Sequence, residues 1–200
     1  MDITIVCVPF QVDVARWGCA HGPQALLERG IGEQIQARGH TIRDIVWVDL
    51  PKSERTRDSV TNLGRIAHRT AAAVKAALAE RNRFVLVLAG DCTHSLGPIG
   101  GLAQARGRPG VVWFDAHGDM NTWETTTTGL LGGMPYAVAL GWDLADWRLA
   151  AGLEPAVRPE AAALIGTSDL DPAEVEALQR HPILHIDAQQ LMQSGVAEQV

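Results

Sequence analysis

The sequence predicts a three-layer α/β/α fold, with helices on both faces of a mainly parallel sheet. Short runs of β-branched and other apolar residues alternate with longer stretches of helical periodicity along the chain. Strands that are separated by helices of this length require crossover connections, which place neighbouring strands parallel to one another. The chain has 200 residues, 46% of them hydrophobic, which is enough for one sizeable core. We therefore expect a single domain over residues 1–200.

The apolar runs predict buried strands, and the segments between them predict helices. The strands are expected at residues 3–8, 45–50, 84–88, 111–114, 163–165 and 183–186. The helices are expected at residues 22–29, 58–80, 96–105, 135–140, 172–179 and 188–193. The helix at 58–80 is the clearest, because apolar residues recur at steps of three and four and because Asp58 or Ser59 can cap its start. Residues 150–159 are expected to form a surface loop.

The charge and the apolar runs exclude several classes of protein. The net charge is −6 with acidic and basic residues mixed along the chain, so there is no basic patch for nucleic acid or for an anionic membrane. No apolar run approaches the roughly 18 residues that span a bilayer, and the N-terminus does not begin like a signal peptide. Three scattered cysteines indicate reduced thiols. We expect a cytoplasmic protein that acts on a small polar molecule.

A loop rich in potential metal ligands follows the expected strand at residues 111–114. Asp115, His117 and Asp119 stand in this loop, at the carboxyl end of the strand, where open parallel sheets bind their ligands. Carboxylates with one imidazole suit Mn²⁺ and related ions better than a thiolate-rich zinc cage does, and a carboxylate can bridge two ions that activate a shared water. The spacing predicts a divalent-metal site. The alternatives are a loop of capping aspartates with a surface histidine, and the Asp-x-His motif of metallophosphoesterases.

Several segments in a fixed order resemble the arginase family, whose members are ureohydrolases. They lie at residues 9–31, 88–95, 115–135 and 165–172 and together cover nearly the whole chain. The second contains Gly90-Asp91-Cys92 where the family has a Gly-Gly-Asp-His-Ser turn, and the third contains the family's aspartate-histidine-aspartate motif. The last, which ends in Asp171-Pro172, is similar to the family's Ile-Gly-x-Arg-x-x-Asp-Pro segment.

This resemblance implies a site with two Mn²⁺ ions and a guanidino substrate. Asp115, His117 and Asp119 match family ligands to a manganese cluster, in which metal-bound hydroxide attacks the guanidinium carbon and urea is released. In the implied arrangement Asp115 bridges the ions, His117 binds one of them, and Asp119 with Cys92 binds the other. Asp119 is also the expected catalytic residue, because it can hydrogen-bond the attacking hydroxide.

The resemblance further implies substrate contacts outside the metal ligands. Asn121 and Thr128 match positions that hold the carboxylate of an amino-acid substrate, and Asp171 and Glu174 match acidic positions near its amino group. Together they favour arginine or Nω-hydroxy-arginine over agmatine. The alternative is that Asp171 and Glu174 bind no substrate and only stabilise the start of a helix. The family resemblance also implies a homo-oligomer.

The chain departs from the family pattern at one of the metal ligands. A gapless alignment places Cys92 where the family has a ligand histidine, and it favours Cys92 over His94, which stands two residues later. A thiolate is softer than imidazole and carries a charge, so it would make metal-bound water less acidic. The same exchange occurs in arginase relatives that hydrolyse Nω-hydroxy-arginine, which keeps that substrate in consideration.

Other departures leave alternative functions open. Leu130 and Gly132 replace an asparagine that contacts substrate and a histidine proposed as a proton shuttle, and Ser168 replaces an arginine. The family's later Asp-x-Asp pair has no counterpart between Asp169 and Val200, so the expected domain lacks the C-terminal portion of the family fold. The alternatives are an agmatinase-, guanidinobutyrase- or formimidoylglutamase-like hydrolase, and a catalytically degenerate paralogue or partner subunit.

Overall fold

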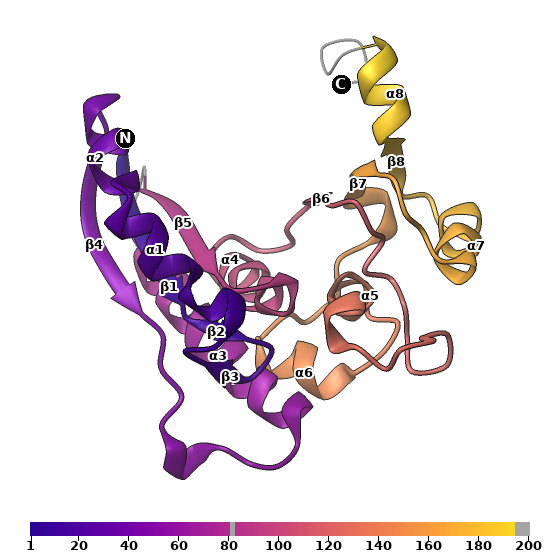
Figure 1. Ribbon diagram of the computed structural model, residues 1–200, viewed down its shortest axis with the longest axis horizontal. Coiled ribbons are helices and arrows are strands. Elements are labelled where there is room, and N and C mark those ends of the chain that lie inside the picture. Colours follow the sequence, from indigo (N-terminus) through magenta and orange to yellow (C-terminus); the bar gives the residue numbers. More distant parts are fainter. Residues whose placement is uncertain (81–82, 195–200) are drawn as a thin grey trace.

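Two parallel sheets form the framework of the protein (Figure 1), for which a computed structural model describes residues 1–80 and 83–194. The first sheet has the order β4-β1-β5, with β4 at Thr41–Trp47, β1 at Asp2–Val8 and β5 at Arg83–Ala89. The second has the order β6-β7-β8, with β6 at Val111–Phe114, β7 at Ala162–Thr167 and β8 at Leu184–Asp187. Every pairing within these two sheets is parallel, which confirms the expected fold class.

Helices cover both faces of the first sheet and give the expected three layers. On one face, α3 (Ser59–Ala77) contributes to the same apolar cluster as Val6 and Val8 of β1. On the other face, Ile3 and Ile5 of β1 pack with residues of α1 (Gly22–Glu28) and α2 (Ile31–Ala37). The central strand β1 is therefore buried on both sides, which explains its nearly continuous apolar sequence.

The helix α3 is positioned by its capping residue and its apolar face. The Asp58 side chain accepts a hydrogen bond from the Thr61 backbone N–H at 2.9 Å, so Asp58 is the N-cap and Ser59 is the first helical residue. Leu63, Ala67 and Val74 are buried, as their spacing predicts. The helix ends at Ala77, short of the expected residue 80.

Removing this cap is expected to lower the free energy of unfolding by about 1 kcal/mol. In Asp58→Ala the backbone N–H of Thr61 loses its acceptor, whereas Asp58→Asn keeps an oxygen in the same place. Urea denaturation of the two variants measures the difference. An equal loss of stability in both would contradict the capping role.

The second sheet is covered mainly on one face. There α5 (Pro135–Leu140) packs against it, and Trp113 of β6 stacks on Tyr136 with the ring centroids 4.9 Å apart. The crossover from β7 to β8 contains α7 (Pro172–Arg180), and α8 (Ala188–Ser194) follows β8. Leu191 of α8 packs on Ala163 and Ile165 and so covers part of the opposite face.

The stretch expected as a surface loop at residues 150–159 is a loop after its first residue, but part of it is buried in the core. It follows α6 (Ala145–Ala150), a helix that was not expected, and both Ala151 and Leu153 are fully buried. A methyl group on Gly100 of α4 (Leu96–Arg106) would lie 2.1 Å from the Ala151 carbonyl oxygen. This close approach of backbone to backbone shows that the first part of the loop belongs to the core, whereas Glu154, Pro155 and Arg158 are exposed, as expected.

The edge strand β4 also differs from the expected strand at residues 45–50. It begins and ends earlier, so Val48 and Leu50 lie beyond it, and both are buried in the cluster beneath α3. Val48 still donates its backbone N–H to the Cys7 carbonyl of β1 at 2.8 Å, so the apolar run combines the end of β4 with buried residues beyond it. A hairpin of β2 (Phe10–Gln11) and β3 (Val14–Ala15) was not expected either. Short 3-10 helices lie at Gly18–His21, Lys52–Glu54, Cys92–Ser95, Leu131–Gly133 and Pro159–Ala161.

None of the helices within residues 1–80 and 83–194 has both the length and the apolar content that crossing a membrane requires.

Candidate metal centre and substrate pocket

The segments that follow β5, β6 and β7 meet around one pocket of about 340 Å³. Their residues come from distant parts of the chain and lie at the carboxyl ends of the strands, where the topology predicts a ligand site. Every residue that was expected to bind metal or substrate lines this pocket: Cys92, Asp115, His117, Asp119, Asn121, Thr128, Asp171 and Glu174.

The start of the metal loop is fixed by hydrogen bonds to the segment after β7. The Asp115 N–H donates to the Ile165 carbonyl at 3.2 Å, and the N–H groups of Ser168 and Asp169 donate to the Ala116 carbonyl at 2.9 Å. These bonds carry the parallel pairing of β6 and β7 beyond the ends of the strands. The loop is therefore held by its own backbone and not only by its side chains.

Asp119 is held in an unusual backbone conformation by the helix that follows it. Its φ is +51°, which is uncommon for a residue with a side chain. Its carbonyl accepts the N–H groups of Tyr136 and Ala137 in the first turn of α5, at 3.0 and 3.1 Å. Strained conformations persist where surrounding structure fixes them and are common at functional sites. The start of α5 thus determines where the Asp119 carboxylate points.

Cys92 is positioned by a turn that Asp91 caps. Asp91 accepts hydrogen bonds from the Thr93 N–H at 3.0 Å and from the Val12 N–H at 2.6 Å. The Cys92 thiol then donates to Asp115 Oδ2 at 3.4 Å. His94 is buried outside the pocket, where its Nε2 lies 3.0 Å from the Phe10 carbonyl oxygen. Of the two alternative ligands after Asp91, the fold thus brings Cys92 to the pocket.

Three side chains form a compact group with the character of a metal site. Single donor atoms of Cys92, Asp115 and Asp119 lie within 4.8 Å of one another. His117 lines the same pocket but is outside this group; its side chain is 62% exposed, and its Nδ1 lies 3.3 Å from Asp115 Oδ1.

The negative groups of this cluster disfavour one another's charge. Burial, and then the charge of Asp115, raise the pKa of Asp119 to about 7. Burial and the charges of Asp119 and Asp115 raise the pKa of the Cys92 thiol far above its ordinary value. The protonated forms are therefore favoured here, and a divalent cation would reverse that preference.

The donor set fits a divalent cation. Asp119 Oδ2 is buried and has no hydrogen-bond partner within the described part of the chain. Buried polar atoms are almost always paired, so an unpaired carboxylate oxygen beside a second carboxylate and a thiol indicates a cation between them. Oxygen donors with a nearby imidazole suit Mn²⁺, and the sulfur also admits softer ions such as Zn²⁺.

Glu174 joins the metal loop to the start of α7. One carboxylate oxygen accepts the Met120 N–H and the other accepts the Asp171 N–H, both at 3.0 Å. The second bond is half of a capping box on α7, which confirms the expected helix start. A methyl group on Gly118 would lie 2.6 Å from Glu174 Cδ, so a side chain at Gly118 would displace this carboxylate.

The residues expected to contact the substrate partly contact one another. The Asn121 side-chain amide donates to Asp171 Oδ2 at 2.8 Å, and its oxygen accepts the Thr125 hydroxyl at 3.0 Å. The Thr128 hydroxyl is exposed and accepts the Leu130 N–H at 3.2 Å. Asn121 and Asp171 thus form one preorganised polar wall of the pocket, and Thr128 stands elsewhere on its rim.

Sequence reasoning missed some of the residues that line the pocket. Thr126, Gly133 and Asp169 belong to it, together with Leu130 and Gly132, which had been noted only as departures from the family pattern. Apart from Gly132 and its two chain neighbours, no atom of the described residues lies within 4 Å of the place where Gly132 would carry a Cβ, so this part of the pocket is open. Asp169 follows a strand end and could have been predicted. A run of consecutive threonines gives no signal that singles out Thr126.

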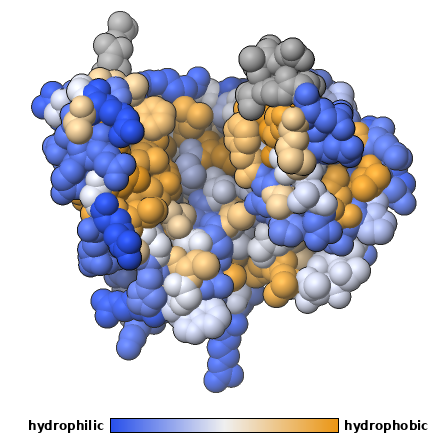
Figure 2. Space-filling model, turned by 45° about the horizontal axis from the view of Figure 1, so that its top comes forward, coloured by the Kyte–Doolittle hydropathy of each residue, from blue (hydrophilic) through white to orange (hydrophobic). Residues whose placement is uncertain are grey.

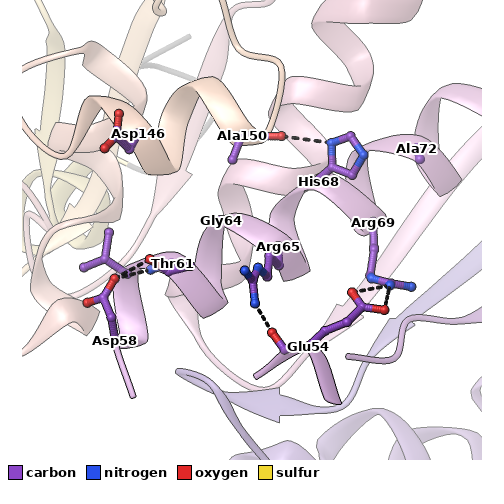
Figure 3. A pocket seen from close by; sticks show the side chains of 11 residues that line it. Glu54, Asp58, Thr61, Gly64, Arg65, His68, Arg69, Ala72, Asp146 and Ala150 are labelled. Atoms are coloured by element: carbon purple, nitrogen blue, oxygen red, sulfur yellow. Dashed lines mark hydrogen bonds and ion pairs between the residues drawn. The ribbon is translucent and has the colours of Figure 1, made fainter. Parts of the chain in front are cut away.

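A larger cavity of about 780 Å³ lies elsewhere, between α3 and α6 (Figure 3). Several of its polar groups are already paired with the protein: Arg69 binds both Glu54 oxygens at 2.7 Å, and His68 Nδ1 lies 3.2 Å from the Ala150 carbonyl oxygen. No metal group among the described residues lies there. We therefore assign the chemistry to the smaller pocket, where the unpaired carboxylate lies.

Comparisons with known proteins agree with this fold. The model of the Arginase family matches residues 1–200. An arginase from Bacillus caldovelox is 36% identical over 179 residues, which are 86% of this chain and 60% of that protein. The crystal structure of arginase from Bacillus subtilis has a TM-score of 0.86 at 27% identity, over 99% of this chain and 67% of that one. The structure of formimidoylglutamase from Bacillus subtilis has a TM-score of 0.71 at 18% identity, over 98% and 58% of the two chains, a likeness of fold alone.

These matches cover only part of the length of each curated relative. The chain spans about 60% of the length of the curated relatives it matches. Within that span the family model covers the whole chain, and the relative from Bacillus caldovelox exceeds 30% identity. The chain therefore belongs to the arginase family.

Proposed function

We propose that this protein contributes the metal and substrate site of a manganese-dependent hydrolase, which converts arginine or Nω-hydroxy-arginine to ornithine and urea or hydroxyurea. The observation that carries the proposal is the buried, unpaired Oδ2 of Asp119 beside Asp115 and Cys92. A carboxylate oxygen in this position has no other evident role within the described part of the chain. Family membership supports a hydrolase of this class.

Asp115, His117, Asp119 and Cys92 would hold the ions in this proposal. When bound, two divalent ions such as Mn²⁺ would lower the pKa of water enough for it to attack at neutral pH. Asp119, whose backbone the start of α5 fixes, would also accept a hydrogen bond from the attacking water. Glu174 fixes the loop through the Met120 N–H. Further donor atoms are needed to complete the coordination of two ions, and we propose that they come from outside the described residues.

The substrate would lie across the pocket with its amino-acid end on the polar wall. Asn121 and Thr128 bind the carboxylate, Asp171 binds the amino group, and the buried charge of Glu174 adds to the attraction. The guanidino end then points to Asp115 and Asp119. The opening at Gly132 leaves space for a substituent on the guanidino group, which supports the hydroxylated substrate.

We also propose a homo-oligomer from the family resemblance, and a cytoplasmic location because Cys7, Cys19 and Cys92 are free thiols.

Kinetics of the purified protein with Mn²⁺ test this proposal. Agmatine lacks the carboxylate and 4-guanidinobutyrate lacks the amino group, so both are expected to react more slowly than arginine or Nω-hydroxy-arginine. A preference for agmatine would contradict the roles of Asn121 and Thr128. A preference for N-formimidoylglutamate would indicate a different hydrolase of the same fold. Bound Mn²⁺ without turnover of any of them would favour the degenerate paralogue.

A variant that removes a single hydroxyl tests the proposed contact with the substrate carboxylate more sharply. Thr128→Val is expected to raise KM for arginine about tenfold or more, because a hydrogen bond to a charged group contributes about 1.5–3 kcal/mol. Thr127→Val is the matched control, since Thr127 is also exposed but does not line the pocket. For agmatine neither variant is expected to change KM. Equal effects of the two variants on arginine would remove Thr128 from the site.

A further inference from the structure

We infer that a cavity of about 490 Å³ at the outer edge of the first sheet binds an aromatic α-amino acid between Arg16, Trp47 and Asp49. We call it the outer cavity. It shares no residue with the pocket that contains the metal group, so the inference does not depend on the proposed hydrolase. Three features support it: an apolar floor with an aromatic wall, two unpaired side chains of opposite charge, and a strained backbone at one of them.

The outer cavity lies at the carboxyl ends of two parallel strands. Phe10 follows β1, whereas Trp47 ends β4 and Asp49 comes two residues later. Open parallel sheets bind their ligands at such strand ends. β4 is the outer strand of the first sheet and lies away from the second sheet (Figure 1), so the outer cavity is distinct from the hollow between the two halves of the molecule, which has apolar surface on both sides (Figure 2).

The floor of the outer cavity is apolar and firmly supported. Phe10, Ala20 and Val48 line it and are buried. A methyl group on Gly90 would lie 2.0 Å from the Phe10 carbonyl oxygen and 3.2 Å from the Ala20 Cα, so the floor packs directly on the turn behind it. Trp47 is 44% exposed and offers an indole on which an aromatic ring can stack. Preformed apolar cavities with a few polar groups are typical small-molecule sites.

Two charged side chains at the outer cavity are available to a ligand. Arg16 comes from the segment after the hairpin, and Asp49 from the segment after β4. Neither side chain has a hydrogen bond or an ion pair within residues 1–80 and 83–194, and the two do not pair with each other. A guanidinium binds a carboxylate through two parallel hydrogen bonds, and a carboxylate binds an ammonium group. A ligand that satisfies both therefore carries one charge of each sign.

The backbone at Arg16 is held in an uncommon conformation. Its φ is +58°, which places a residue with a side chain in the left-handed region. The segment after it is fixed, because the Cys19 N–H donates to Gln11 Oε1 at 2.9 Å and the Ala20 N–H donates to the Trp17 carbonyl at 3.0 Å. Strained residues of this kind cluster at ligand sites. The strain thus supports a binding role for Arg16.

These features together select the class of ligand. A nucleotide or another anion would place its charge beside Asp49, and a polyamine would place its charge beside Arg16. A zwitterion avoids both conflicts, and its ammonium and carboxylate groups match the two side chains. The indole of Trp47 and the apolar floor then accept an aromatic side chain. An aromatic α-amino acid has all of these groups.

Titration calorimetry of the purified protein with L-phenylalanine tests this inference. Saturable binding with a Kd below about 1 mM is expected. 3-Phenylpropionate lacks the ammonium group, phenethylamine lacks the carboxylate and L-alanine lacks the ring, so each is expected to bind about tenfold or more weakly. No saturable binding of L-phenylalanine, or equal affinity for L-alanine, would overturn the inference.

Variants of the two charged residues test each contact against the ligand group that it binds. Arg16→Gln is expected to weaken binding of L-phenylalanine and 3-phenylpropionate about tenfold and to leave phenethylamine unaffected. Asp49→Asn should weaken L-phenylalanine and phenethylamine but not 3-phenylpropionate. Trp47→Leu should weaken all three, whereas Trp17→Leu, which removes an exposed indole outside the outer cavity, should weaken none. Equal losses for all three ligands in Arg16→Gln and Asp49→Asn would contradict the assigned contacts.

A variant of the metal pocket shows where the amino acid binds. Asn121→Ala alters the polar wall of that pocket and is expected to leave the Kd for L-phenylalanine unchanged. Binding that is lost in Asn121→Ala and retained in Arg16→Gln would belong to the metal pocket and would overturn the inference. None of these measurements uses metal or turnover, so their failure leaves the proposed hydrolase untouched.

Discussion

Asp119→Asn is expected to lower kcat/KM for the proposed guanidino substrate by more than about 100-fold. The change removes the charge of a buried carboxylate that lies within 4.8 Å of the Asp115 and Cys92 donors. Even the outer partners of metal ligands typically contribute 10- to 100-fold to affinity or activity, so a direct ligand contributes more. Asp169→Asn is the matched control, because Asp169 lines the pocket without belonging to the metal group. Steady-state kinetics in saturating Mn²⁺ measure both, and equal effects would remove Asp119 from its proposed role.

The stability of the same variant without metal separates loss of function from loss of folding. The pKa of Asp119 is raised from 3.8 to about 7 in the folded protein, so the folded state binds this proton more tightly than the unfolded state does. The charged carboxylate therefore destabilises the fold increasingly as the pH rises from about 4 to 7, and the penalty stays above that range. Asp119→Asn removes the penalty and is expected to be the more stable protein at pH 8 in the presence of a chelator. Lower stability of the variant at pH 8 would contradict this account.

Glu174→Ala is expected to lower the free energy of unfolding by several kcal/mol. The buried carboxylate accepts two backbone N–H groups, those of Met120 and Asp171, and leaving a buried donor unpaired costs about 1–3 kcal/mol each. Both the metal loop and the start of α7 lose their connection. Urea denaturation measures the loss, and metal affinity should fall with it.

The neighbouring Glu176 provides the matched control for this prediction. It is an exposed residue of the same helix, and its ion pair with Arg180 has an N–O distance of 2.8 Å. Exposed pairs of this kind contribute about 0–1 kcal/mol, so Glu176→Ala should be nearly neutral. A similar loss of stability in Glu174→Ala and Glu176→Ala would mean that the two hydrogen bonds from backbone N–H groups to Glu174 contribute little to the free energy of unfolding.

The fold could be predicted where apolar periodicity and strand pairing coincide. The run from Ile3 to Val8 is buried on both faces and forms β1, and the stripe through Leu63 and Val74 marks the buried face of α3. Prediction failed where apolar residues are buried for another reason. Leu50 fills the core outside any strand, and the buried Leu153 belongs to a loop that packs under α4. Local sequence does not distinguish these two kinds of burial.

The sequence predicts which residues line the pocket, but it does not predict how they are arranged. Asp115, His117 and Asp119 share one loop, so their proximity followed from the sequence. The clamp from Glu174 to Met120 joins residues that are 54 positions apart, and it exists only because β6 and β7 are neighbours. The left-handed conformation of Asp119 likewise depends on where α5 begins. Such contacts follow from the tertiary structure and leave no local pattern.

The manganese content of the folded protein tests the central claim most directly. After dialysis against Mn²⁺, the unaltered protein is expected to retain bound metal, and the double variant His117→Ala/Asp119→Ala is expected to retain much less. The double variant His68→Ala/Asp146→Ala removes the same residue types from the larger cavity (Figure 3) and should bind as much metal as the unaltered protein. Unchanged metal content in a folded His117→Ala/Asp119→Ala sample would contradict the assignment of this loop as a metal site.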